Sequence, residues 1–153
     1  MVRRRSLKGD YCPSARALDV IGDWWSLLIV RDAFDGLTRF GEFQKSLGIA
    51  KNILSERLRT LVARDILRTA AAADGGAHLE YHLTGKGRDL FPVMVALRQW
   101  GERHLFAPGE KHSKLIERDT GWFLGEPVLR FHHVLIRDAA YRRLLKGTRA
   151  ELH

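Results

Sequence analysis

One stretch of the sequence, from about residue 50 to residue 65, carries apolar and polar side chains at helical spacing. Polar residues three or four positions apart share one surface of such a helix, and here they are Lys51, Asn52, Ser55 and Arg59. Lysine and arginine can pair with guanine, asparagine with adenine, and serine with bases or phosphates. One well-placed bidentate pair discriminates between bases by roughly 1–3 kcal/mol. We therefore expect this surface to enter the major groove of duplex DNA.

Further basic side chains lie close to this surface in the sequence and are predicted to assist it: Arg57, Arg64, Arg68 and His78. Arg57 and Arg64 would contact the DNA backbone from the flank of the helix. Arg68 and His78 fall in the segment that follows, where they are candidates for phosphate or minor-groove contact. Because residues 74–78 carry no lysine or arginine, we expect the helix to dominate binding.

The polar outer face could contact DNA, or it could be the ordinary solvent-exposed side that every amphipathic surface helix has. Its position favours DNA contact, because the helix follows a glycine-containing turn and precedes a hairpin, as a recognition helix does. Basic side chains also outnumber acidic ones in this region. The opposite face is apolar and is predicted to pack on a core through Ile53, Leu54, Leu58, Leu61 and Val62.

Three shorter helices are predicted before this one. Pro13 suits the first turn of a helix, which places Cys12 at the N-cap. Asp23 is the predicted N-cap of a second helix. Thr38 is the predicted N-cap of a third, which Gly48 ends.

A hairpin and one long helix are predicted after it. Two β-like segments, 66–72 and 79–83, flank the turn signal Asp74-Gly75-Gly76. Thr84 is the predicted N-cap of one long helix, which Pro92 inside it should bend locally. This order of elements indicates a mainly α fold with a small β-hairpin wing, the winged helix-turn-helix.

The chain is predicted to hold one main domain. Residues 1–10 form a basic arm, 11–106 the winged helix-turn-helix domain, 107–120 a linker and 121–153 a helical C-terminal extension. The long helix carries an apolar stripe that a small domain has few places to bury, which favours a homodimer. Its members are Leu90, Met94, Leu97 and Trp100.

Composition narrows the classes of partner. With 26 Lys and Arg against 18 Asp and Glu, the formal net charge of +8 favours a polyanion, either nucleic acid or an anionic membrane face.

The single cysteine, Cys12, excludes a disulfide-stapled secreted fold and a zinc site built on several thiolates. No signal-like segment follows the basic N-terminus, and the longest apolar stretch, residues 24–30, is too short to cross a bilayer. We expect a soluble, cytoplasmic protein.

Enzyme classes find no support in the sequence. It contains neither a P-loop nor a G-x-S-x-G elbow. His78 and His82 could share a strand face and His132 and His133 are adjacent, but neither pair has the carboxylates or thiols that would complete a metal site. We expect no catalysis, no metal and no cofactor. A winged helix used only for protein interaction is the alternative to DNA binding, and salt dependence separates the two.

Several of these motifs together resemble the HxlR-type branch of MarR-like bacterial regulators. They are Cys12-Pro13, Gly22-Asp23-Trp24-Trp25, Phe40-Gly41-Glu42-Phe43, Ile49 to Leu58, Tyr81 to Arg88 and Trp100-Gly101. The resemblance covers residues 11–106 and implies a winged-helix homodimer whose first helix and helix from Thr84 form the two-fold interface. It also implies a local repressor or activator, often responding to electrophiles, oxidants or aldehydes. A two-fold dimer would read inverted half-sites about one helical turn, roughly 34–36 Å, apart.

The single thiol has two interpretations. A helix N-terminus favours the thiolate of Cys12, as would Arg16 and the arginines at positions 3–5 if they lie near. In the resembling family, a cysteine in this position is the sensor in several members, which implies a reaction of Cys12 with oxidants or electrophiles. The alternative is a small side chain packed in the dimer seam.

The tryptophans and the C-terminal segment also leave alternatives open. Trp24, Trp25 and Trp100 are candidates to line an effector pocket near the dimer seam, or are plain core residues. Residues 128–153 resemble the helical segment that follows the ATPase module in large multidomain bacterial regulators. Because no ATPase motif precedes them, no ATPase activity is implied. This resemblance would make the chain a natural fusion or a truncated reading frame; the alternative is a tail that packs on the dimer.

Overall fold

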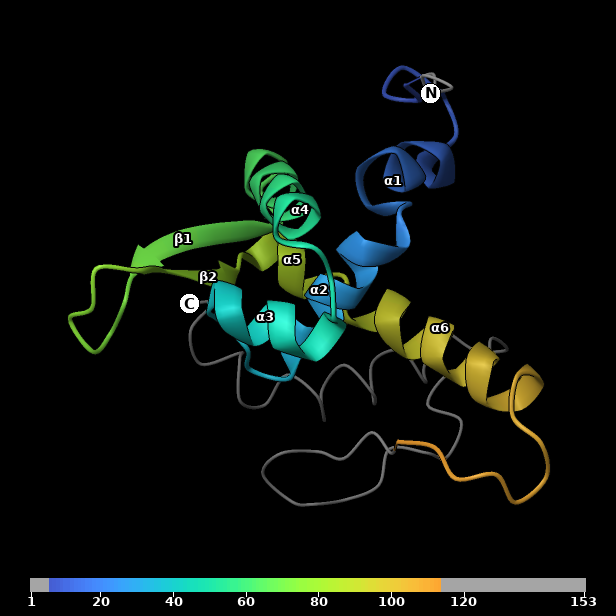
Figure 1. The fold of residues 1–153 in the computed structure, drawn as a ribbon. Coiled ribbons are helices and arrows are strands. Elements are labelled where there is room, and N and C mark those ends of the chain that lie inside the picture. Colours follow the sequence, from blue (N-terminus) through green and yellow to red (C-terminus); the bar gives the residue numbers. More distant parts are fainter. Residues whose placement is uncertain (1–5, 114–153) are drawn as a thin grey trace, which may run out of the picture. The chain divides into compact units, whose positions relative to one another are not determined.

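The computed structural model describes residues 6–113 of the 153-residue chain (Figure 1). It divides into two units, with the boundary between Met94 and Val95. The elements follow one another as α1 (Pro13–Ile21), α2 (Trp24–Phe34), α3 (Phe40–Leu47), α4 (Lys51–Ala63), β1 (Leu67–Ala71), β2 (Leu79–Leu83), α5 (Gly85–Arg88) and α6 (Phe91–His104). The prediction of a mainly helical winged helix-turn-helix is thereby confirmed, whereas the extension predicted for residues 121–153 lies outside the described residues.

Helices α1 and α2 begin where their N-cap residues predict. Cys12 is the N-cap of α1 and Pro13 occupies its first turn. The Asp23 carboxylate accepts the backbone N–H of Ser26 at 2.9 Å, which satisfies one of the free donors at the start of α2.

Helix α3 begins one residue later than predicted. Its N-cap is Arg39, not Thr38, because the free N–H groups at this end are satisfied from inside the helix. The Glu42 carboxylate accepts the backbone N–H groups of Thr38 and Arg39, both at 2.9 Å. Gly48 then ends α3 with φ of 61°, a left-handed conformation that glycine adopts without steric cost. The tight turn brings α4 directly after α3.

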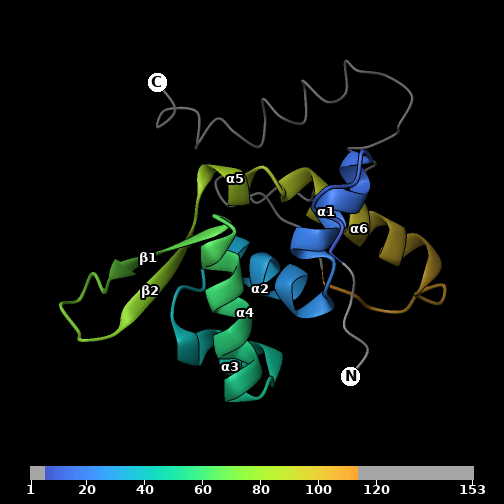
Figure 2. The same ribbon diagram turned by 90° about the horizontal axis from the view of Figure 1, so that it is seen from above.

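The two strands form an antiparallel hairpin that projects away from α2 and α4 of the same unit in both views (Figures 1 and 2). Leu67 is paired with Leu83 at its base, and Ala71 with Leu79 toward its tip. The segment before α3 adds to the same sheet, since Arg39 forms a bridge with Glu80. The start of α3 and the hairpin are therefore joined through the backbone.

The long helix predicted after Thr84 is two helices, so that prediction is wrong. The Thr84 hydroxyl accepts the backbone N–H of Gly87 at 2.9 Å and caps only the short α5. The chain turns at Asp89 and Leu90, and α6 begins at Phe91 with Pro92 as its second residue. Proline lacks an N–H and clashes with a preceding helical turn, so it fits the first turn of a helix better than the interior.

The core of the first unit joins α2, α3, α4 and the base of the hairpin. Its buried members are Ile29, Val30, Phe43, Ile49, Leu54, Leu58, Leu61, Ile66 and Leu67. Full burial of one such side chain contributes roughly 1.5–3 kcal/mol. Three of the five predicted inward residues of α4 are buried and the other two, Ile53 and Val62, are partly buried against the core, so the opposite face of that helix points outward.

The described part of the second unit begins within α6 and continues into a turn. Along α6 an ion pair joins Arg98 Nε to Glu102 Oε1 at 2.8 Å. After the helix, the Glu110 carboxylate accepts the backbone N–H of Ala107 at 2.9 Å, and Gly109 has φ of 80°. Nowhere in residues 6–113 is a helix long and apolar enough to cross a bilayer.

Candidate nucleic-acid interface

The outer face of α4 carries the four side chains predicted to read DNA. Lys51, Asn52, Ser55 and Arg59 are all exposed. Within residues 6–113 their side chains form no hydrogen bond or ion pair. The structure brings the four together on one helix face and leaves their donors and acceptors open to solvent.

This face is fixed in place by the opposite side of α4. Leu54, Leu58 and Leu61 are at most 1 % exposed. An extended backbone at Ala50 begins the helix directly after the turn from α3. The helix therefore presents its polar side chains on a rigid element rather than on a loop.

Two of the predicted helpers are already paired with carboxylates. Arg57 Nε lies 3.5 Å from Asp23 Oδ1, and Arg64 Nη1 lies 3.9 Å from Asp19 Oδ2. The two acidic partners belong to α1 and to the start of α2, so these arginines tie α4 to the elements before it. Their positive charges are partly neutralised inside the protein.

The hairpin places its two predicted contacts far from each other. Arg68 is exposed on β1, opposite His82 in the register, while His78 is exposed beside the tip. His78 Nε2 lies 3.9 Å from Asp74 Oδ1. His82 Nε2 lies 3.1 Å from Glu80 Oε2. No group of three or more metal-ligating side chains occurs in the described part of the chain.

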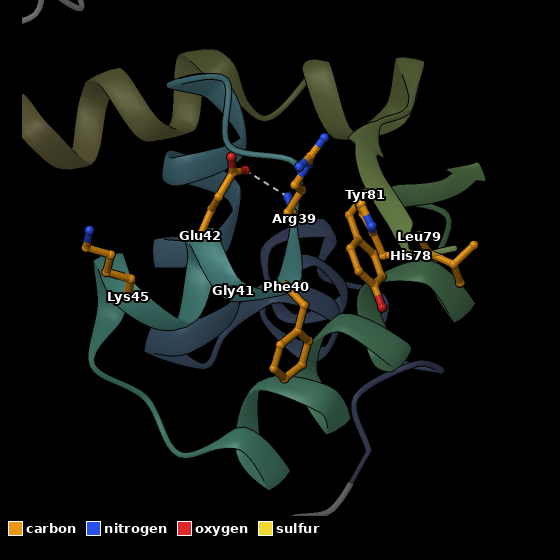
Figure 3. Close-up of a pocket in the computed structure, with 8 residues that line it drawn as sticks. All are labelled: Arg39, Phe40, Gly41, Glu42, Lys45, His78, Leu79 and Tyr81. Atoms are coloured by element: carbon orange, nitrogen blue, oxygen red, sulfur yellow. Dashed lines mark hydrogen bonds between the residues drawn. The ribbon is translucent and has the colours of Figure 1, made fainter. Parts of the chain in front are cut away.

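An open depression of about 730 Å³ lies between the start of α3 and β2 (Figure 3). It is lined by Arg39, Phe40, Gly41, Glu42, Lys45, His78, Leu79 and Tyr81. Sequence reasoning missed Arg39, whose guanidinium reaches Asp74 at 2.6 Å. No local pattern could have found this contact, because the two residues are 35 positions apart.

Cys12 is partly exposed at the start of α1. Hydrogen bonds from the backbone N–H groups of Ala15 and Ser14 lower the pKa of its thiol. Arg16 Nε donates to the backbone oxygen of Asp10, and no arginine is among the causes that lower this pKa. The helix end, rather than a neighbouring cation, therefore favours the thiolate.

The three tryptophans predicted to line an effector pocket differ in exposure. Trp24 is 72 % exposed, and its ring centroid lies 5.4 Å from that of Trp25, which packs against the core. Trp100 belongs to the second unit and is 53 % exposed. Trp25 thus has a core role, while a pocket formed by all three stays a prediction.

These features define a class of protein. Two helices joined by a tight turn, a second helix with an exposed polar and basic face, and an adjoining hairpin constitute a winged helix-turn-helix. Residues 20–108 match the family of HxlR-like helix-turn-helix proteins, to which the chain belongs. It is an HTH-type transcriptional regulator, and its family is not one of enzymes.

Individual relatives agree with this assignment. The uncharacterized HTH-type transcriptional regulator Rv3095 of Mycobacterium tuberculosis is 44 % identical over 107 residues, which cover 69 % of this chain and 67 % of that protein. The crystal structure of PA1607, a candidate transcription factor, is similar with a TM-score of 0.73 and 62 % identity, covering 77 % of this chain and 82 % of that one. The redox regulator HypR in its oxidized form gives a TM-score of 0.57 at 33 % identity, covering 63 % of this chain and 100 % of that one.

Proposed function

We propose that the protein is a homodimeric regulator that binds an inverted-repeat operator in duplex DNA and reads it with the outer face of α4. The observation that carries this proposal is the set of side chains on that face. Lys51, Asn52, Ser55 and Arg59 are exposed and free of ion pairs in the described residues, at the position of a recognition helix. Residues of these types supply donors and acceptors that match base edges in the major groove.

The other predicted contacts have secondary roles in this proposal. Arg57 and Arg64 keep α4 in position through Asp23 and Asp19 and offer their remaining N–H donors to phosphates. Arg68 lies on the exposed side of β1 and reaches the flanking backbone. His78 contributes beside the hairpin tip.

The proposal of a dimer is supported by apolar side chains that are exposed to solvent in the described residues. On α6, Leu97 is 49 % exposed and Trp100 is 53 % exposed, and on α1, Leu18 is 52 % exposed. Apolar surface of this kind is stabilised by burial in an interface. The implied family dimer uses these same elements, and it would place two copies of α4 roughly 34–36 Å apart on one side of the duplex.

The test selects duplexes from a random library with the purified protein at low salt and footprints the enriched sequence. We expect an inverted repeat with protected half-sites one helical turn apart. If roughly 6–10 phosphates are contacted, the affinity should fall by about 10³–10⁵ between 50 and 200 mM salt. Absence of enrichment for any duplex would refute the proposal and favour a protein-interaction module.

A response to oxidants or electrophiles through Cys12 is the second part of the proposal. It is supported by the lowered pKa of the thiol and its partial exposure, since the thiolate is the reactive form. The structurally similar HypR is a redox regulator. With one cysteine in each chain, the products available are an inter-subunit disulfide, a mixed disulfide or an adduct.

A further inference from the structure

The tip of the hairpin carries a negative charge where a DNA-binding wing approaches phosphates. Asp74 is the charged residue of this tip, and residues 74–78 include no lysine or arginine to offset it. An unneutralised carboxylate there would oppose the polyanion. In the structure, the carboxylate of Asp74 is paired with an arginine from outside the hairpin.

Both oxygens of the Asp74 carboxylate are engaged. Oδ2 lies 2.6 Å from the Arg39 guanidinium, and Oδ1 accepts the backbone N–H of Gly76 at 2.9 Å. Between them, Gly75 has φ of 75°, which shapes the tight turn. The Gly76 N–H and Arg39 hold the pKa of Asp74 below its usual value, so the carboxylate stays charged and the contact persists.

Arg39 is itself anchored to β2, close to where that strand leaves the tip. Its backbone forms a bridge with Glu80, and the Tyr81 N–H donates to the Thr38 oxygen at 2.7 Å. Its guanidinium also lies 3.7 Å from Glu80 Oε1, on a side chain that is only 10 % exposed. One cation therefore faces a carboxylate of the tip and a carboxylate of β2.

We propose that Arg39 is a positioning residue that clasps the wing tip to the start of α3, so that it sets where the wing meets DNA and cancels the charge of Asp74. This inference rests on the proposed function. In it Arg39 acts through its ion pair with Asp74 and not through a phosphate contact, and Nη2 is the guanidinium atom that faces both carboxylates. Figure 3 shows Arg39 at the edge of the depression between α3 and β2.

The clasp acts on the part of the hairpin that lies beyond the strand pairing. Strand pairing ends at Ala71 and Leu79, which leaves residues 72–78 beyond the ladder. A two-stranded hairpin is at best marginally stable by itself in water. A contact that spans 35 residues restricts the tip more than another contact inside the hairpin would.

Two measurements on the full chain test the clasp. The first is amide hydrogen exchange of Gly76 and its neighbours in the free protein. The second is affinity, with hydroxyl-radical footprinting, for the selected duplex. The variants are Arg39→Ala, Asp74→Ala, their double variant and the conservative Arg39→Lys. Lys45→Ala is the control, because it removes a positive charge that lines the same depression without an ion pair to the tip.

We expect Arg39→Ala to raise exchange at Gly76 several-fold and to weaken duplex binding about three- to fivefold, the scale of one exposed ion pair. Protection should be lost at the flank under the wing and kept under α4. In the Asp74→Ala background, Arg39→Ala should add less than about a 1.5-fold loss, because its partner is already absent. Arg39→Lys should restore part of the affinity, and Lys45→Ala should leave exchange at Gly76 unchanged.

Other outcomes would overturn the inference. Additive losses from Arg39→Ala and Asp74→Ala would show that Arg39 contacts DNA directly. Unchanged exchange at Gly76 in both Arg39→Ala and Arg39→Lys would show that the tip does not depend on this cation. If the wild-type protein binds no duplex, the proposed function fails, and the exchange measurement still decides whether Arg39 holds the tip.

Discussion

At the scale of single residues, the arginines of α4 fall into two kinds. Arg57 lies 3.5 Å from a carboxylate oxygen of Asp23, whereas Arg59 has no ion-pair partner among residues 6–113. A cation without a partner can exchange its water for a base edge or a phosphate without breaking an ion pair of the protein. The unpaired residues of α4 are therefore the ones we expect to contribute most to specificity.

Replacement of Arg59 tests this division. We expect Arg59→Ala to weaken binding to the selected operator roughly 5- to 100-fold, because a bidentate contact to a base is worth about 1–3 kcal/mol. Gel-shift titration on the operator and on a scrambled duplex measures affinity and selectivity together. Lys111→Ala removes the same charge after α6 and should change both values much less. Equal losses in the two variants would contradict a specific role for Arg59.

The thiol of Cys12 gives a second prediction at this scale. Because its pKa is lowered, alkylation by iodoacetamide should already be fast at a pH below the usual titration range of cysteine. Diamide should then release the wild-type protein from its operator, while Cys12→Ser should remain bound. A Cys12→Ser variant that still responds to diamide would show that the thiol is structural.

At the scale of elements, the hydrogen bonds at the start of α3 stabilise the first helix of the helix-turn-helix. The Glu42 carboxylate satisfies the backbone N–H groups of Thr38 and Arg39 at the start of α3, so these two donors are not available to a phosphate. Those hydrogen bonds hold the pKa of Glu42 below its usual value, with the Thr38 N–H as the largest cause. The cap therefore stabilises α3 only while the carboxylate is ionised.

The pH dependence of Glu42→Ala tests the cap. A depressed pKa in the folded state adds stability above the unfolded pKa, and this stability is lost as pH falls through the folded pKa. At pH 7 we expect Glu42→Ala to lower the free energy of unfolding by about 1 kcal/mol. The difference from wild type should shrink as the pH falls through the lowered pKa of Glu42. Urea denaturation measures it, with Glu56→Ala as an exposed control in α4, and a pH-independent difference would contradict the assignment.

At the scale of the whole molecule, the exposed apolar residues of α6 favour assembly of two copies. Leu97 and Trp100 on α6 are 49 and 53 % exposed, and Leu105 directly after the helix is 67 % exposed. A two-fold dimer would bury them and would double the number of phosphate contacts, which makes binding to an inverted repeat much tighter than binding to one half-site.

A charge placed on this surface tests the dimer. We expect Leu97→Lys to shift the protein toward the monomer in sedimentation velocity and to weaken binding to the full operator at least tenfold, although it adds a positive charge. The melting temperature of the monomeric unit should change little, because the wild-type side chain is half exposed there. Lys111→Glu, beyond α6, is the control and should leave the assembly state unchanged. A dimeric Leu97→Lys that binds normally would place the interface elsewhere.

The sequence by itself determined the order of elements, the core face of α4 and the outward face opposite it. Helical periodicity, the N-cap residues Cys12 and Asp23, and the turn residue Gly48 act within a few positions of the chain, so local pattern was sufficient. The break between α5 and α6 was missed because a proline near a helix start and a proline inside a helix look alike in sequence.

The tertiary structure decided which basic side chains form ion pairs with carboxylates of the protein and which remain unpaired in the described residues. Arg57 pairs with Asp23 and Arg39 with Asp74, and neither pair has a signal in the local sequence. The physical reason is that an ion pair between distant positions forms only when packing brings the two charges within about 4 Å. The pattern of charges along the chain therefore predicted a DNA-binding face, and the fold selected the residues that remain available to it.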